Sequence, residues 1–222
     1  KLLSLVHKNL GNHCNVEKHF TPTYNPWDQR LCLIPDGDLY KAIKRGKAEI
    51  VTDKIKSFSK IGIVLESGEE IETDIIVTAT GLNLKLLGGI SFEIDDKKVV
   101  FSERYTYKGL MFSNVPNLVY SIGYINASWT LRSEITAEFV CRILNRMKEV
   151  DATEVIAHKK NEGISTTDSP LIDDFSPGYI RRGAHLMAKQ SDKDPWKFNQ
   201  NYTLDKKLIR NAPLEDGVLE FR

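Results

Sequence analysis

A continuous hydrophobic stretch covers residues 75–79, where apolar and β-branched side chains follow one another before Gly81 ends the run. Such a run predicts a strand that is buried on both faces of a sheet. Central strands of α/β proteins carry their binding sites at their carboxyl ends. The pattern therefore predicts a ligand beside residues 80–83. The alternative is a core strand whose glycine turn binds nothing.

A second run of this kind covers residues 118–122 and ends at Gly123. An amphipathic helix is predicted after it, because large apolar residues recur at helical spacing. Asn126 or Ser128 can cap the start of this helix. A Glu138–Arg142 pair would join two successive turns of it. The residues of the apolar face are Leu131, Ile135, Phe139, Val140, Ile143, Leu144 and Met147.

The start of this helix is a candidate binding site, with Trp129 and Thr130 in its first turn. The N-terminus of a helix offers free N–H donors and a partial positive charge. It can therefore hold an anion or the carbonyl edge of a flavin ring. The alternative is an ordinary connection between a strand and a helix.

The remaining pattern predicts shorter elements, and together with the runs above it indicates an α/β fold. Beyond residue 151 the periodicity fades and predicts a mostly looped tail. The expected elements are a helix over 2–10 that ends at Gly11, a helix from Asp38 to residue 45 that ends at Gly46, a strand over 48–52, a hairpin of 61–65 with 70–73, short β segments over 91–100 and 104–107, and a helical turn near 204–209.

Arg30 closes an irregular loop over residues 19–30 that is rich in aromatic rings and contains two prolines. Long loops of this kind often carry function. Arginine keeps its charge at any working pH and presents planar donors. Arg30 could therefore bind a phosphate or stabilise an anionic oxygen. The alternative is a solvated surface arginine.

Composition and charge argue against several kinds of partner. The 222 residues include 31 basic and 30 acidic side chains, so no charge excess indicates a nucleic acid or a membrane surface as partner. No apolar run approaches the roughly 20 residues that span a bilayer. Three scattered cysteines predict free thiols in a reducing compartment, and hence a cytoplasmic location. The five histidines lack zinc-site spacing, so we expect no metal.

Several stretches, taken together and in order, resemble the flavin-containing monooxygenases of the Baeyer–Villiger class. The resemblance covers nearly the whole chain and is closest to the ethionamide-activating branch. The matching stretches are His19-Phe-Thr-Pro-x-Tyr-x-Pro-Trp-Asp-Gln-Arg30, Pro35-Asp-Gly-Asp-Leu39, Asp74-Ile-Ile-Val-Thr-Ala-Thr-Gly-Leu-Asn83, Tyr107-Lys-Gly109, Pro116-Asn117, Gly123-Tyr-x-Asn-Ala-Ser-Trp-Thr-Leu131 and Ser176-Pro-Gly-Tyr179.

The resemblance implies FAD and NADPH as cofactors, bound by two domains related to the disulfide-reductase fold. It implies that a C4a-peroxyflavin inserts one oxygen atom from O2 into a ketone, or oxidises sulfur or nitrogen in a small organic substrate. Arg30 would be catalytic and would stabilise the negative peroxyflavin. The cofactor-binding residues would be Gln29, Thr80, Gly81, Gly123, Asn126, Trp129 and Thr130.

The chain departs from this family in one large respect, because neither glycine-rich dinucleotide fingerprint occurs in it. With a start at Lys1 rather than Met, this predicts a C-terminal half that is inactive and binds FAD and NADPH weakly or not at all. Residues 1–83 would then end the NADPH domain and carry the linker strand. Residues 84–150 would end the FAD domain, and 151–222 would form an extended tail.

Two other readings stay open on the sequence. A reductase of the thioredoxin-reductase kind would need a C-x-x-C motif, which the chain lacks. A non-catalytic half-domain could instead act as an assembly or binding module. Apolar surface left by a missing half makes a homo-oligomer an additional expectation.

Overall fold

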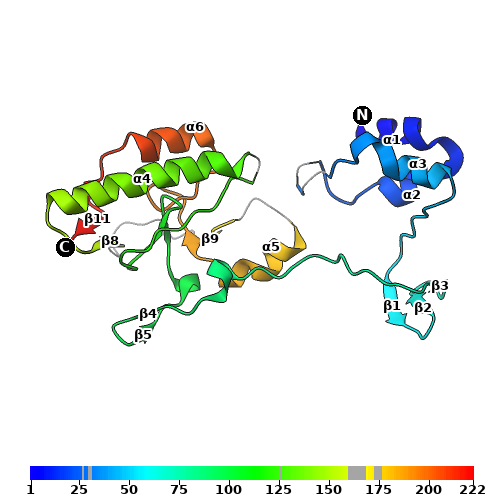
Figure 1. Ribbon diagram of the computed structural model, residues 1–222, viewed down its shortest axis with the longest axis horizontal. Coiled ribbons are helices and arrows are strands. Elements are labelled where there is room, and N and C mark those ends of the chain that lie inside the picture. The colour runs from blue at the N-terminus through cyan, green and yellow to red at the C-terminus, as the bar shows by residue number, and fades with distance from the viewer. Residues whose placement is uncertain (27, 30–31, 126, 160–168, 173–176) are drawn as a thin grey trace. The chain divides into compact units, whose positions relative to one another are not determined.

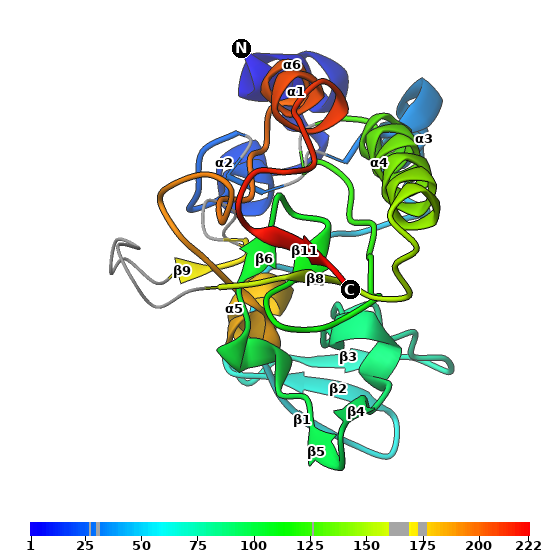
Figure 2. The same ribbon diagram turned by 90° about the vertical axis from the view of Figure 1, so that its left-hand side faces the viewer.

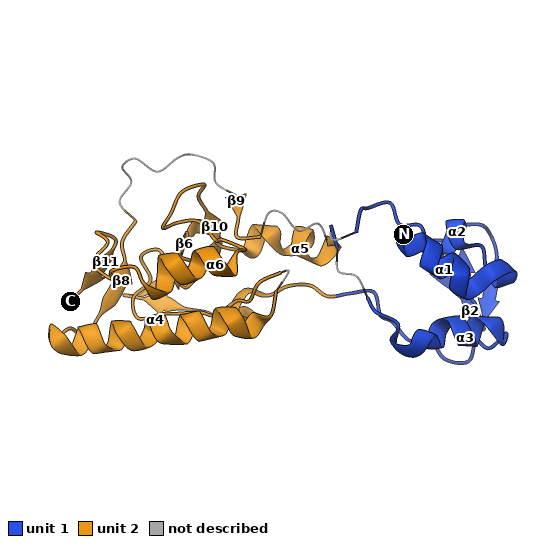
Figure 3. Ribbon diagram, turned by 90° about the horizontal axis from the view of Figure 1, so that it is seen from above, with its two compact units in different colours: residues 1–81 blue, residues 82–222 orange. Residues whose placement is uncertain are grey.

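The computed structural model describes residues 1–26, 28–29, 32–125, 127–159, 169–172 and 177–222. The chain divides into two compact units, Lys1–Gly81 and Leu82–Arg222 (Figure 3). Both contain helices and small antiparallel sheets, so the fold is mixed α/β, as the sequence predicts.

The first unit begins with three short helices. The helices α1 (Leu2–Leu10), α2 (Val16–Phe20) and α3 (Asp38–Lys44) enclose a small core of Leu10, Val16 and Ile43. Gly11 ends α1 at a φ of 54°, a conformation that favours glycine, which confirms the predicted stop. Single turns of 3₁₀-helix cover Gly11–His13 and Pro35–Gly37, and Gly37 holds the N-cap position of α3.

A three-stranded antiparallel sheet completes this unit in the order β1 (Ile55–Phe58), β2 (Gly62–Leu65) and β3 (Glu70–Glu72). The tight turn between β2 and β3 contains Gly68 at a φ of 89°, so the predicted hairpin is confirmed. The strand predicted over residues 48–52 is not formed, since this segment has no regular structure.

The strand predicted over residues 75–79 is wrong. This segment has no strand structure, and Ile75 and Val77 are 77% and 83% exposed. A buried strand needs neighbouring strands on its edges and a layer on each face. None of the sheets in the described residues extends to this segment, so its apolar side chains stay in solvent.

The second unit is built on the 21-residue helix α4 (Trp129–Glu149), which confirms the predicted amphipathic helix. The short helix α6 (Tyr202–Asp205) and the π-helical turn Lys206–Arg210 lie along it (Figure 1). The largest core cluster combines Ile135, Phe139 and Ile143 of α4 with C-terminal residues such as Trp196 and Leu219. The C-terminal segment, although mostly irregular, therefore supplies part of the core.

Two details of α4 differ from the prediction. Leu144, expected on the apolar face, is 58% exposed. Glu138 bonds Arg210 rather than forming the expected pair within the helix, and Arg142 donates to the carbonyls of Ile209, Arg210 and Ala212. Packing against α6 and the following turn thus takes both side chains away from the local pair.

The strand predicted over residues 118–122 is also wrong, because no regular strand forms there. Only Val119 forms a bridge, with Met111, although Tyr120 is buried in a second core cluster. The two-stranded pairs of this unit are short (Figure 2). They are β4 (Glu93–Ile94) with β5 (Lys97–Lys98), β6 (Thr106–Tyr107) with β7 (Met111–Phe112), β8 (Val155–Ala157) with β11 (Leu219–Phe221), and β9 (Ser169–Pro170) with β10 (Lys189–Gln190).

The remaining regular elements of this unit are helical. They are α5 (Gly178–Gly183) and the 3₁₀ turns Leu86–Gly89, Phe101–Glu103 and Ala184–Leu186. Within the described ranges, every helix is either too short or too polar to cross a membrane.

Candidate functional site

The best-defined candidate site is the loop before α4 together with the first turn of that helix. Gly123 lies against the indole of Trp129, so closely that a Cβ at position 123 would be 2.0 Å from Cγ of that ring. A side chain therefore cannot be added without moving the indole. Trp129 itself remains 55% exposed, so a flat apolar ring is presented at the start of the helix.

Within the described residues, no side chain caps the backbone donors in the first turn of α4. Ser128 occupies the N-cap position, but its hydroxyl lies 2.7 Å from Oγ1 of Thr130, and no cap hydrogen bond is formed by the described residues. Ser128 therefore takes the expected N-cap position but does not make a cap hydrogen bond. Asn126, the other expected cap, lies outside the described residues. Free N–H groups and the helix dipole make this end suited to an electron-rich acceptor.

A buried ion pair lies next to this loop. Arg132, in the second turn of α4, has no exposed side-chain surface and donates to the Asp205 carboxylate and to the carbonyl of Lys108. Tyr124 donates its hydroxyl to Oδ2 of Asp205 over 2.7 Å. Among the described residues, Nε of Arg132 finds no hydrogen-bond partner.

Burial shifts the pKa values of the Asp205 carboxyl group and the Tyr124 hydroxyl. Burial raises the pKa of Asp205 above its ordinary value, while the charge of Arg132 acts in the opposite direction. Burial, followed by the hydrogen bond to Asp205, raises the pKa of Tyr124 to about 12. Tyr124 is therefore a neutral hydroxyl at physiological pH and acts as a donor to the carboxylate.

The structure brings together only part of the set of residues predicted from sequence. Gly123, Trp129 and Thr130 lie together in the second unit, at the start of α4. Gln29, half-buried and bridged to Pro26, belongs to the first unit, as do the exposed Thr80 and Gly81. Arg30 and Asn126 lie outside the described residues.

Sequence reasoning missed Tyr124, Arg132 and Asp205. One signal was present, because Arg132 falls at helical spacing from Ile135 and Phe139 on the buried face. A charged residue in an apolar stripe requires a buried partner. The identity of that partner could not be read, since Asp205 is separated from Arg132 by more than seventy residues.

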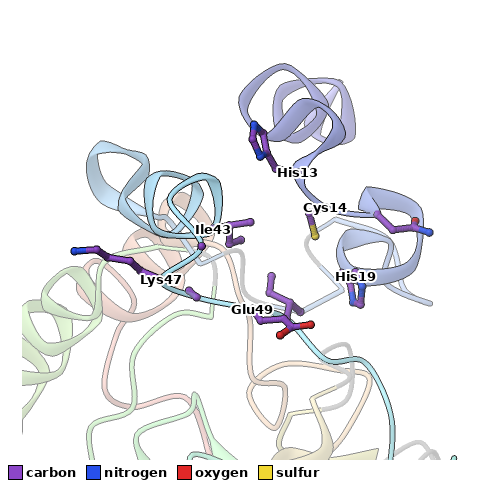
Figure 4. Close-up of a pocket in the computed structure, with 10 residues that line it drawn as sticks. His13, Cys14, His19, Ile43, Lys47 and Glu49 are labelled. Atoms are coloured by element: carbon purple, nitrogen blue, oxygen red, sulfur yellow. The ribbon is translucent and has the colours of Figure 1, made fainter.

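A pocket of about 540 Å³ lies in the first unit (Figure 4). Its lining residues His13, Lys47 and Glu49 are exposed, and Lys47 points away from the others. His19 is engaged by Oγ1 of Thr52 at 2.8 Å. The pocket contains none of the residues predicted from sequence, and its polar groups do not converge on a common point. Within the described ranges, no three His, Cys, Asp or Glu side chains are grouped to hold a metal.

Comparison with known proteins confirms the resemblance to flavin-containing monooxygenases. The chain is 47% identical over 219 residues to the FAD-containing monooxygenase EthA of Mycobacterium tuberculosis, which covers 99% of the chain and 44% of EthA. It is 44% identical over 220 residues to EthA of Mycolicibacterium smegmatis, with 99% of the chain and 44% of that protein covered. AlmA of an Acinetobacter species, assigned as an FAD-binding monooxygenase, is 48% identical over 204 residues, which cover 92% of the chain and 41% of AlmA.

The chain thus spans less than half the length of the curated relatives it matches. No family model matches it. No solved structure matches it either.

The described residues fit one part of FAD. The donors of α4, which no described side chain caps, suit the electron-rich edge of a flavin ring, and the exposed indole of Trp129 on Gly123 adds an apolar surface. The pyrophosphate of FAD needs a glycine-rich turn at a helix N-terminus, and this sequence contains none. The chain therefore fits the ring of the cofactor and not its phosphates.

Proposed function

The chain is homologous over nearly its full length to flavin-containing monooxygenases, and from this premise we propose that it is the C-terminal part of an FAD- and NADPH-dependent monooxygenase. The complete protein would insert one oxygen atom from O2 into a ketone, in a Baeyer–Villiger reaction, or oxidise sulfur or nitrogen in a small organic substrate. The observation that carries the proposal is the 47% identity to EthA over 99% of the chain.

The proposed organisation follows the disulfide-reductase fold. Residues 1–83 would complete an NADPH-binding domain, residues 84–150 an FAD-binding domain, and residues 151–222 would form the C-terminal tail. The division of the chain between residues 81 and 82 supports a joint near the Ala-Thr-Gly turn. Three free cysteines are compatible with the reducing cytoplasm.

The proposed roles of individual residues follow from their chemistry. When bound, FAD would supply the electron transfer from NADPH and the activation of O2. Arg30 would hold a permanent positive charge beside the negative charge that develops in the reaction. Gln29 would lie near the NADPH ribose, and Thr80 with Gly81 would form the turn at the domain joint. Trp129 would line the substrate side of the ring, with the donors of α4 at its edge.

By itself the chain is expected to be inactive, because it lacks both phosphate-binding fingerprints. Isothermal titration of the isolated chain with FAD tests this expectation, and we expect no heat of binding at micromolar FAD. Binding with micromolar affinity would contradict it. The competing reading, a non-catalytic assembly module, predicts that even the full-length protein is purified colourless.

A further inference from the structure

We propose that Tyr124, Asp205 and Arg132 form a positioning network that holds the loop before α4 in place beside the flavin ring. The C-terminal segment, which supplies Asp205, then contributes to the cofactor site. This inference rests on the proposed function, because it assumes that the ring lies at this loop. It assigns a role to residues that do not themselves touch the cofactor.

The loop is tied to the C-terminal segment at two consecutive residues. Tyr124 is 1% exposed and donates its hydroxyl to Asp205 over 2.7 Å. The backbone N–H of the next residue, Ile125, donates to Oε1 of Gln200 over 2.8 Å. Gln200 lies just before α6, and Asp205 is the last residue of that helix. Tyr124 and Ile125 therefore cannot shift without breaking contacts to a distant part of the chain.

Arg132 joins a third segment to these two. Its guanidinium bonds Asp205 and the Lys108 carbonyl, and it lies over the ring of Phe198 with 5.3 Å to the ring centre. Gly109, at a φ of 66°, is packed so tightly here that a Cβ would lie 2.4 Å from the Phe198 ring and 2.5 Å from Nη2 of Arg132. Little free space remains for the network to rearrange.

The network reaches the candidate site through Tyr124 in the loop and through Arg132 in the helix. Tyr124 directly follows Gly123, the residue on which the Trp129 indole rests. Arg132 lies three residues after Trp129 on the same helix and fixes the start of α4. A change in the network therefore alters both the contact of Gly123 with Trp129 and the direction of the free N–H donors.

A purely structural role is the competing explanation, because buried ion pairs often only specify a fold. The chain offers a matched control. Tyr107 is also fully buried in the second unit and donates its hydroxyl to a carboxylate, Oδ2 of Asp216, over 2.5 Å. The two tyrosines make the same kind of bond, but Tyr107 is not part of the loop. Their Phe variants lose equivalent interactions at different places.

The test uses the full-length protein with Tyr124→Phe and Tyr107→Phe. Both variants should melt at a lower temperature than the parent. Only Tyr124→Phe should shift the visible flavin spectrum and raise the Kd for FAD, by about tenfold or more for the loss of one hydrogen bond to a charged group. Equal Kd values and unchanged spectra in both variants would overturn the inference. A parent protein without FAD would instead reject the proposed function.

A second pair of variants avoids the risk of unfolding, because Gln200 is exposed. Gln200→Ala removes the acceptor for the Ile125 N–H, and it should weaken FAD binding with little change in melting temperature. Gln200→Glu keeps an oxygen acceptor at that position and should restore the parental Kd. If Gln200→Ala binds FAD as tightly as the parent, the loop is not held by the C-terminal segment and the inference is wrong.

Discussion

At the scale of single residues, the close contact between Gly123 and Trp129 restricts which side chain position 123 can carry. Gly123→Ala would drive a methyl group into the indole, since the added Cβ would lie 2.0 Å from Cγ. Overpacking of this kind costs about 1–3 kcal/mol. We expect Gly123→Ala to be destabilised by that amount in denaturant unfolding, with a shift in tryptophan fluorescence.

The double variant supplies the control for this prediction. Trp129→Ala removes the ring that the methyl group would meet, so adding Gly123→Ala to it should cost much less than Gly123→Ala alone. Additive losses from the two substitutions would show that the indole does not rest on Gly123.

Residues in this site differ in how far they could be predicted. The start of α4 after Gly123 was predictable, because a glycine-ended run before an amphipathic helix marks a turn and a helix start. Tyr124 and Asp205 were not, because their hydrogen bond joins positions 81 residues apart and leaves no local pattern. Tertiary contacts of this kind appear only when the chain is folded.

At the scale of elements, the correctly predicted elements are those that contacts within their own unit stabilise. The helices α1 and α4 and the hairpin of β2 and β3 satisfy their hydrogen bonds locally and bury one face against their own unit. Residues 75–79 have the composition of a central strand, yet a central strand depends on neighbours that the described chain does not supply. Composition alone could not show that they are missing.

The exposed run over residues 75–79 gives a prediction at this scale. Val77 is 83% exposed, so Val77→Asp should change the unfolding free energy of the isolated chain by no more than about 0.5 kcal/mol. In the full-length protein, where the rest of the proposed NADPH-binding domain would cover this run, the same change should abolish recovery of folded, FAD-containing protein.

Val77→Ile, which keeps the position apolar, is the control and should fold in both settings. If the full-length protein tolerates Val77→Asp as well as the isolated chain does, then the rest of the protein does not cover this run. The proposed assignment of residues 1–83 to a larger NADPH-binding domain would then lose its structural support.

At the scale of the whole molecule, the central claim is that this chain completes an enzyme whose phosphate-binding motifs lie elsewhere in the protein. Two observations support it: the chain spans less than half the length of its relatives, and it contains a helix start suited to a flavin ring without a cradle for pyrophosphate.

The most direct measurement is the flavin content and NADPH oxidation of the purified full-length protein. We predict a yellow protein that carries stoichiometric FAD, consumes O2 as it oxidises NADPH, and transfers one oxygen atom to a ketone or sulfide. Replacing Arg30 by Ala should lower product formation while FAD stays bound. A colourless full-length protein that oxidises no NADPH would contradict the account.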